Sequence, residues 1–141
     1  MEILLVEDSP SDAFIVKEAL KRAGGANSLH IATDGVEAMA FLRRQGQYID
    51  MPRPDIILLD LNMPRKDGRE VLVEVKAEDK LKCIPVIVLT SSSADQDVIK
   101  AYQLYANCYL IKPTDFSKFK ELIKAIAAFW FSNVTLPPHD C

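Results

Sequence analysis

Five short apolar runs, each followed by a segment with helical periodicity, restrict the fold of this sequence more than any other feature. None of the runs alternates apolar with polar residues, so each is typical of a strand that is covered on both faces, as in a parallel sheet. The runs cover residues 3–6, 29–32, 56–59, 86–89 and 109–111. Strands that alternate with helices in this way predict an α/β fold.

Capping residues mark the starts of several of the intervening helices. Ser9 is followed by Pro10 and Asp12, while Asp34 and Asp67 are each followed three residues later by a glutamate. A capping side chain, a proline at the first helical position and an acid at the third are typical of helix N-termini. The expected helices span residues 10–23, 35–45, 68–77, 95–106 and 115–131.

Five strand–helix units indicate an open, doubly wound sheet, because a closed barrel needs about eight. The predicted fold is a flavodoxin-like five-stranded parallel sheet with strand order 2-1-3-4-5 and helices on both faces. A length of 141 residues suits one domain. Residues 1–131 are assigned to that domain and residues 132–141 to a C-terminal extension, with no output domain expected.

Charge and cysteine content indicate a cytoplasmic protein. The net charge of −3 comes without a basic block, which argues against a nucleic-acid partner. No apolar run approaches the roughly 20 residues of a membrane span, and the acidic N-terminus does not resemble a signal peptide. Cys83, Cys108 and Cys141 form no CxxC motif, so we expect buried or idle thiols in a reducing compartment.

Polar residues follow the expected strands at their carboxyl ends, the edge at which doubly wound sheets bind ligands. They are Glu7 and Asp8 after the first strand, Asp60 and Asn62 after the third, Thr90 at the end of the fourth, and Lys112 after the fifth. Converging carboxylates repel one another unless a cation lies between them, and Mg²⁺ prefers carboxylate oxygens. The sequence therefore predicts a magnesium site at this edge.

The same edge is suited to phosphoryl chemistry. Lys112 provides a mobile positive charge for a phosphoryl group, and Thr90 provides a hydroxyl donor. Once the negative charge of the phosphoryl group is neutralised, an oxygen of Asp60 can attack the phosphorus in line and form an acyl phosphate. Each residue alone has a simpler interpretation, as a cap, a polar loop residue or a solvated lysine. Their joint occurrence at the correct strand ends favours the functional interpretation.

The ordered set Glu7-Asp8, Asp60 in "LLDLNMPRKDG", Thr90-Ser91 and Lys112-Pro113 resembles the receiver domains of bacterial two-component response regulators. The resemblance covers about residues 2–130. It implies a cytoplasmic phosphorelay in which Asp60 accepts a phosphoryl group from a sensor histidine kinase. The protein would then be a signalling switch rather than an enzyme, with at most slow self-dephosphorylation.

The resemblance also implies roles for the residues around Asp60. Glu7, Asp8, Asp60 and the main-chain carbonyl of Asn62 would hold Mg²⁺, with Mn²⁺ or Ca²⁺ as substitutes. Glu7 stands where an aspartate is commoner, so it would reach the metal through water. Thr90 and Tyr109 would form the switch pair, Lys112 would bind phosphate, and the Lys112–Pro113 bond would be cis.

Three further segments resemble a narrower group. "EDSPSDA", "QYIDMPRP" and "FWFSNVTLPP" are similar to single-domain regulators that are paired with bacterial, especially cyanobacterial, phytochrome histidine kinases. This likeness implies a light-sensing kinase as the partner.

Other functions are less consistent with the residues. A metal-dependent phosphohydrolase with an aspartyl-phosphate intermediate is the main alternative, but it needs a second aspartate where this chain has Asn62. Glu7 and Asp8 would repel the phosphate of a flavin. A degenerate receiver that acts only as an adaptor is disfavoured, because no site residue is missing.

The last two expected helices carry more apolar surface than one core contact uses. On the last helix the apolar arc is about 200° wide. Exposed patches of this size tend to be partner sites, so we expect a homodimer through the fourth helix, fifth strand, fifth helix and C-terminal extension. The candidate interface residues are Tyr102, Tyr105, Leu122, Phe129 and Phe131. The alternative is that these side chains pack under the proline-rich tail.

Overall fold

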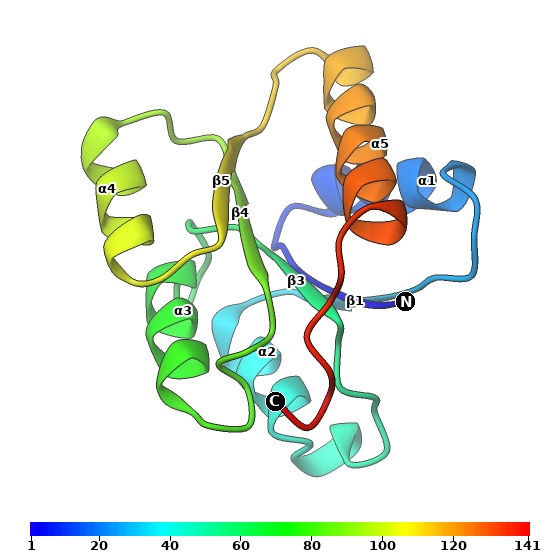
Figure 1. The fold of residues 1–141 in the computed structure, drawn as a ribbon. Helices are drawn as coiled ribbons and strands as arrows, with labels where there is room; N and C mark the ends of the chain where they lie inside the picture. The colour runs from blue at the N-terminus through cyan, green and yellow to red at the C-terminus, as the bar shows by residue number, and fades with distance from the viewer.

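A computed structural model describes the whole chain, residues 1–141, as one sheet between two layers of helices (Figure 1). The strands are β1 (Glu2–Val6), β2 (Ser28–Ala32), β3 (Ile56–Leu59), β4 (Val86–Thr90) and β5 (Cys108–Ile111). The helices are α1 (Pro10–Arg22), α2 (Gly35–Leu42), α3 (Gly68–Ala77), α4 (Asp95–Gln103) and α5 (Phe116–Ser132), with a short 3-10 helix at Gly46–Tyr48. All strand pairs are parallel, in the order β2-β1-β3-β4-β5, which confirms the predicted fold.

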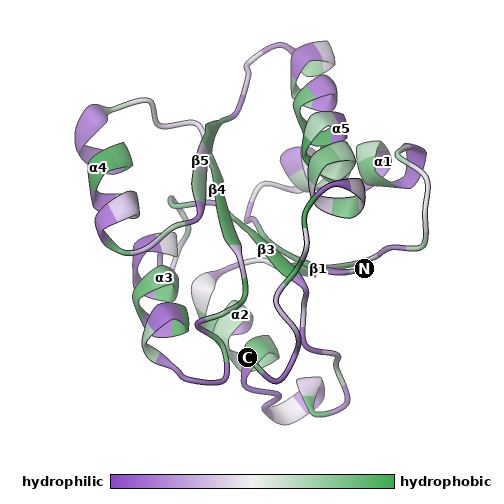
Figure 2. Cartoon of the chain, viewed as in Figure 1, coloured by the Kyte–Doolittle hydropathy of each residue, from purple (hydrophilic) through white to green (hydrophobic).

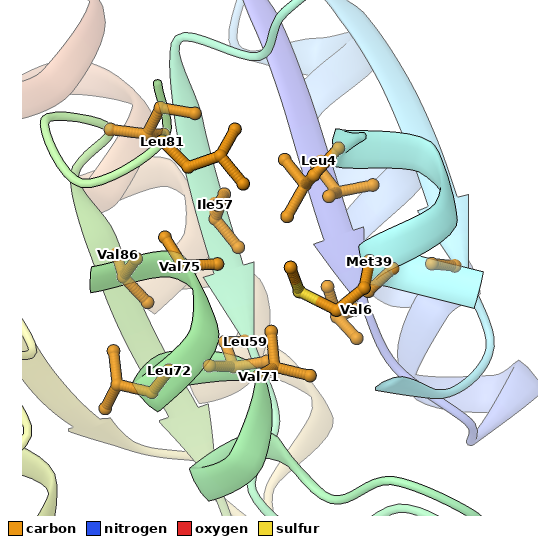
Figure 3. Packing of buried hydrophobic residues seen from close by; sticks show 14 of the residues in the cluster. Leu4, Val6, Met39, Ile57, Leu59, Val71, Leu72, Val75, Leu81 and Val86 are labelled. Carbon is orange, nitrogen blue, oxygen red and sulfur yellow. The ribbon is translucent and has the colours of Figure 1, made fainter. Parts of the chain in front are cut away.

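The side chains of each strand point alternately to two separate cores. From β1, Leu4 and Val6 enter the core beneath α2 and α3, whereas Ile3 and Leu5 enter the core beneath α1 and α5. Figure 3 shows the first core, in which Met39 of α2 and residues of α3 pack on β1, β3 and β4. Burial on both faces explains why the strands are continuous apolar runs, and Figure 2 shows β3 and β4 as strongly hydrophobic between mixed helices.

The helix starts agree with the capping pattern. The side chain of Ser9 accepts a hydrogen bond from the backbone N–H of Asp12, and that of Asp34 accepts one from Glu37. Asp67 and Glu70 form a reciprocal capping box at the start of α3.

Two helices end three residues earlier than predicted. Helix α2 ends at Leu42 rather than at residue 45, and Arg44 follows with φ of 55°. Helix α4 ends at Gln103 rather than at residue 106, and Tyr105 follows with φ of 70°. A residue in the left-handed region terminates a helix, and neither residue is a glycine that would have indicated this in the sequence.

Residues 133–141 form a tail without helix or strand. It leaves the end of α5, passes the amino ends of β1 and β3, and finishes on the side of the sheet that carries α2 (Figure 1). This path brings the Cα atoms of Cys83 and Cys141 to 6.2 Å, within the range that a disulfide spans, and the two residues are disulfide-bonded. The expectation of idle thiols is therefore wrong for this pair, while Cys108 on β5 is a free, half-buried thiol.

None of the helices is long and apolar enough to cross a membrane.

Candidate functional site at the carboxyl edge of the sheet

The sheet register brings the predicted site residues together. Val6 of β1 lies beside Leu59 of β3, so the residues that follow them, Glu7 and Asp60, emerge next to each other. The backbone N–H of Asp60 donates to the carbonyl of Val6 at 3.0 Å, which extends the pairing by one step. Both acidic side chains are nearly buried, with exposed residue fractions of 3% for Glu7 and 7% for Asp60.

Lys112 lies at the centre of the acidic groups. It follows β5, and its backbone N–H donates to the carbonyl of Thr90 at 2.8 Å. Its ammonium nitrogen contacts three carboxylates, 2.5 Å from Glu7, 2.9 Å from Asp12 and 3.0 Å from Asp60. Burial alone would lower the pKa of Lys112, but the hydrogen bonds to Glu7 and Asp12 outweigh it, so the pKa is raised and Lys112 stays charged.

The carboxylate of Glu7 is fixed in place by contacts within the protein. Besides Lys112, its carboxylate accepts a hydrogen bond from the backbone N–H of Ser9 at 3.1 Å. Burial raises the pKa of Glu7 to about 7, and the negative charge of Asp60 adds to this, although Lys112 acts in the opposite direction. Burial thus favours the protonated form of Glu7, whereas its contact with Lys112 favours the charged form.

Three carboxylates form a group that fits a hard divalent cation. One oxygen each from Glu7, Asp8 and Asp60 lie within 4.8 Å of one another, and Asp8 is exposed while the other two are buried. Carboxylate oxygens at this spacing, open to solvent on one side, suit an ion such as Mg²⁺ that keeps several waters. Asn62 contributes a backbone N–H that donates to Asp60 at 3.3 Å, which helps to orient the carboxylate.

Thr90 has a hydroxyl group that lacks a partner. The residue is fully buried at the end of β4, and its Oγ1 makes no hydrogen bond. A buried polar atom without a partner is uncommon and costs free energy, so it calls for an explanation. A phosphoryl group on Asp60 would supply an acceptor for this donor.

Tyr109, the other half of the expected switch pair, contacts the loop that follows Thr90. Its half-buried ring packs on the core under α3, and its hydroxyl donates to the carbonyl of Ser92 at 2.9 Å. The hydroxyl of Ser92 donates to Asp97 of α4, and Asp97 also accepts from Arg69 of α3 at 2.8 Å. This chain of contacts ties the loop after β4 to α3, α4 and β5.

The loop that carries Asp60 needs a glycine where it enters α3. A Cβ atom on Gly68 would lie 2.1 Å from the carbonyl oxygen of Asp60, closer than any real contact. The backbone N–H of Gly68 donates to the carbonyl of Leu61 at 2.9 Å. Only a residue without a side chain lets α3 start this close to the acceptor loop.

The structure corrects one site prediction and adds two sets of residues. The chain has no cis peptide bond, so the expectation for Lys112–Pro113 is wrong. Trans is the more stable isomer, and Lys112 already reaches Asp60 with it. Sequence reasoning treated Asp12 only as a capping acid and missed its contact with Lys112. It also missed the Arg69–Asp97 pair, and only the acid in the first turn of α4 could have suggested it.

The candidate interface residues are exposed to different degrees. Tyr102, Tyr105 and Phe129 are exposed, at 49%, 75% and 54%. Leu122 and Phe131 are half-buried and pack against the core under α1 and α5. Part of the wide apolar arc on α5 is therefore used inside the chain.

Comparison with known proteins agrees with the geometry of this edge. The response regulator receiver domain matches residues 3–125. The response regulator Rcp1 of Synechocystis sp. is 51% identical over 135 residues, which cover 96% of this chain and 92% of Rcp1. The crystal structure of Mn²⁺-bound Rcp1 has a TM-score of 0.93 at 50% identity and covers 97% of this chain and 99% of the Rcp1 chain.

A second solved structure is similar to the same extent. The phosphorylated cyanobacterial phytochrome response regulator RcpA has a TM-score of 0.93 at 45% identity and covers 97% of this chain and 98% of its own. Because the domain match spans most of the chain and Rcp1 is matched over nearly its full length, the protein belongs to the response regulator receiver family.

Proposed function

We propose that the protein is a single-domain response regulator that accepts a phosphoryl group on Asp60 from a sensor histidine kinase. The observation that carries this proposal is the position of the Asp60 carboxylate, 3.0 Å from the ammonium group of Lys112 and beside Glu7 and Asp8. A carboxylate oxygen becomes a useful nucleophile toward phosphorus only where the charge of the phosphoryl group is neutralised.

In this proposal the acidic group holds a divalent cation. Glu7, Asp8, Asp60 and the main-chain carbonyl of Asn62 would bind Mg²⁺, with Mn²⁺ or Ca²⁺ as substitutes. A bound cation would neutralise negative charge on the incoming phosphoryl oxygens. The fit of three carboxylates within 4.8 Å supports this assignment, as does the Mn²⁺-bound form of Rcp1.

Lys112 and Thr90 would bind the phosphoryl group once it is on Asp60. One N–H group of Lys112 would then donate to a phosphoryl oxygen instead of a carboxylate. The buried hydroxyl of Thr90 would donate to a second phosphoryl oxygen. Movement of Thr90 toward the phosphoryl group shifts the loop to which Tyr109 is hydrogen-bonded. This coupling would pass the signal to α4 and β5, with Thr90 and Tyr109 as the switch pair.

The chain offers no acid at position 62 to activate water, so the acyl phosphate should persist and be lost only slowly. The protein would then act as a switch and not as a phosphohydrolase. Its working unit would be the receiver domain of residues 1–131, with residues 132–141 as an extension.

We further propose a bacterial phytochrome kinase as the partner. Support comes from the likeness to RcpA, which is a phytochrome response regulator. The reaction would take place in the cytoplasm, since the ATP that charges a histidine kinase is there.

Mass measurement after treatment with acetyl phosphate and Mg²⁺ tests the phosphoacceptor. The wild-type protein should gain one phosphoryl group, and Asp60→Asn should gain none. Asp50→Asn, which changes an exposed aspartate elsewhere, should behave as the wild type. A phosphoryl adduct on Asp60→Asn, or an unmodified wild-type protein, would contradict the assignment.

We also propose a homodimer through α4, β5, α5 and the C-terminal extension. Figure 1 shows β5 as the edge strand between α4 and α5, and the exposed residues are Tyr102 of α4, Tyr105 of the loop before β5 and Phe129 of α5. Sedimentation should show that Phe129→Asp shifts the protein toward monomer. Phe14→Asp is the matched control, because Phe14 of α1 is 59% exposed but lies on another surface. Equal dimer fractions for wild type and Phe129→Asp would count against this surface.

A further inference from the structure

The tail is attached to the rest of the protein by few interactions besides the Cys83–Cys141 disulfide. His139 pairs with Asp55 at 2.7 Å, and the backbone N–H of Cys141 donates to Pro138 within the tail itself. At its start, the N–H groups of Asn133 and Val134 both donate to the carbonyl of Phe129 on α5. Between these ends the tail makes no other hydrogen bond, although Val134, Leu136 and Pro137 are half-buried, and the disulfide is its one covalent cross-link to the rest of the fold.

The disulfide joins two parts of the fold that the sheet separates. The tail starts on the face covered by α1 and α5, whereas Cys83 lies in the loop between α3 and β4 on the other face (Figure 1). The tail thus crosses beneath the amino edge of the sheet, opposite the edge that carries Asp60. Its path can change without any movement of the candidate phosphoryl site.

One feature beside the tail disfavours its docked position. Arg53 lines a cavity of about 650 Å³ together with His139, Asp140 and Cys141. The Nε and Nη2 atoms of Arg53 are buried and have no acceptor. Guanidinium donors without a partner cost free energy. The disulfide and the His139–Asp55 pair hold the tail in place against this cost.

The disulfide is accessible to thiols in solution. Cys141 is exposed and Cys83 is half-buried. Accessible disulfides exchange readily, and disulfides of cytoplasmic proteins are usually transient or redox-sensing. Burial raises the pKa of the third cysteine, Cys108, which makes it a poor thiolate and keeps it from competing.

We propose that Cys83 and Cys141 form a reversible redox clip that docks the C-terminal tail when oxidised and releases it when reduced. The cytoplasmic location of this clip rests on the proposed function. The thiol–disulfide exchange itself does not depend on the proposed function. In reduction, a thiolate of a small dithiol attacks the exposed sulfur of Cys141, and Cys83 leaves as a thiolate and takes a proton. The second thiol of the reductant then displaces Cys141, which gives two cysteine thiols and one oxidised dithiol. A glutathione-type disulfide reverses the change.

The proposal is tested on the full chain by counting thiols after equilibration with oxidised glutathione or with dithiothreitol. After unfolding in urea, which exposes the half-buried Cys108, iodoacetamide should label that one cysteine in the oxidised protein and all three in the reduced protein. Hydrogen exchange of the Val134 and Cys141 amides, which are hydrogen-bonded in the docked tail, should be faster in the reduced protein by at least about tenfold. Three labelled cysteines under both conditions, or equal exchange rates, would overturn the proposal.

Single-cysteine variants make the test specific. Cys83→Ser and Cys141→Ser should each show the fast exchange of the reduced tail under both conditions. Cys108→Ser should keep the redox dependence of the wild type. If this variant lost the redox dependence, the pairing of Cys83 with Cys141 would be contradicted. Phosphorylation by acetyl phosphate serves as a separate readout. Its failure would remove the proposed role of Asp60 and leave the thiol count unchanged.

Discussion

Lys112, which follows β5, donates a hydrogen bond to Asp12 in the first turn of α1, with Nζ and Oδ2 2.9 Å apart although 100 residues separate the two positions. Asp12 therefore takes one of the three donors of Lys112, the other two being directed at Glu7 and Asp60. It also adds a negative charge beside the place where we propose that a phosphoryl group arrives.

Replacing Asp12 by asparagine should speed phosphorylation of Asp60. The variant frees a donor of Lys112 and removes one repelling charge, and for a partly exposed pair we expect a rate increase of about threefold. The initial rate with acetyl phosphate and Mg²⁺, followed by mass measurement, checks this. Glu18→Gln is the control, because it removes a charge from α1 that pairs with Lys21 and not with Lys112. A rate equal to that of Glu18→Gln would mean that Asp12 does not restrain Lys112.

Replacing Thr90 by valine should stabilise the unphosphorylated protein. The hydroxyl group is buried without a partner, so its removal should raise the free energy of unfolding by about 1 kcal/mol. Thermal unfolding should then shift upward by about 3 °C. Thr90→Ser keeps the hydroxyl and loses a methyl group, so it should be less stable than wild type. A loss of stability in Thr90→Val would show that the hydroxyl has a partner in solution.

Most of the fold was predictable because local signals and burial agree. The continuous apolar runs at Ile56–Leu59 and at residues 86–89 are buried on both faces, and Asp34 and Asp67 cap the helices that they were predicted to start. Residues Glu7 and Asp60 could be placed together because parallel strands end at the same edge. That inference needs only the direction of the strands. Strands that alternate with helices run parallel, so the sequence pattern gives this direction.

Other features depend on contacts that leave no local signal. The ion pair of Asp12 with Lys112 looks, in sequence, like an ordinary first-turn acid. The disulfide of Cys83 with Cys141 depends on the path of a tail that has no periodicity, across a separation of 58 residues. The early end of α2 follows from a left-handed conformation at Arg44, for which arginine gives no hint.

Acid titration should reveal the contribution of Asp34, the N-cap of α2. Burial alone would raise the pKa of Asp34, but hydrogen bonds from the Glu37 N–H and from Arg65 lower it below its usual value. A carboxylate with a lowered pKa contributes stability above its unfolded pKa of about 3.9, and that stability is lost as pH falls through the folded pKa.

Two variants of Asp34 separate its charge from its capping role. At pH 7 we expect Asp34→Ala to lose about 1 kcal/mol, and Asp34→Asn to lose less because asparagine also caps helices. Wild type and Asp34→Asn should converge as pH falls through the folded pKa of Asp34, which lies below its usual value, because both side chains are neutral there. Urea unfolding at several pH values measures this. A constant difference between them at all pH values would mean that the charge of Asp34 does not contribute.

Lys112→Met should make the protein depend more strongly on divalent cations. Without its ammonium group, Glu7 and Asp60 lose the positive charge that now lies between them. Breaking a buried ion pair costs about 3 kcal/mol, and protonation of Glu7, whose pKa is already about 7, offsets part of this. A cation bound by the carboxylates would replace the missing charge. The increase in melting temperature on adding Mg²⁺ should therefore be larger for Lys112→Met than for wild type.

Lys66→Met, which removes a lysine that pairs with Glu74 away from the acidic group, should respond to Mg²⁺ as the wild type does. If Mg²⁺ stabilises Lys112→Met no more than wild type, Lys112 and the cation do not neutralise the same carboxylates.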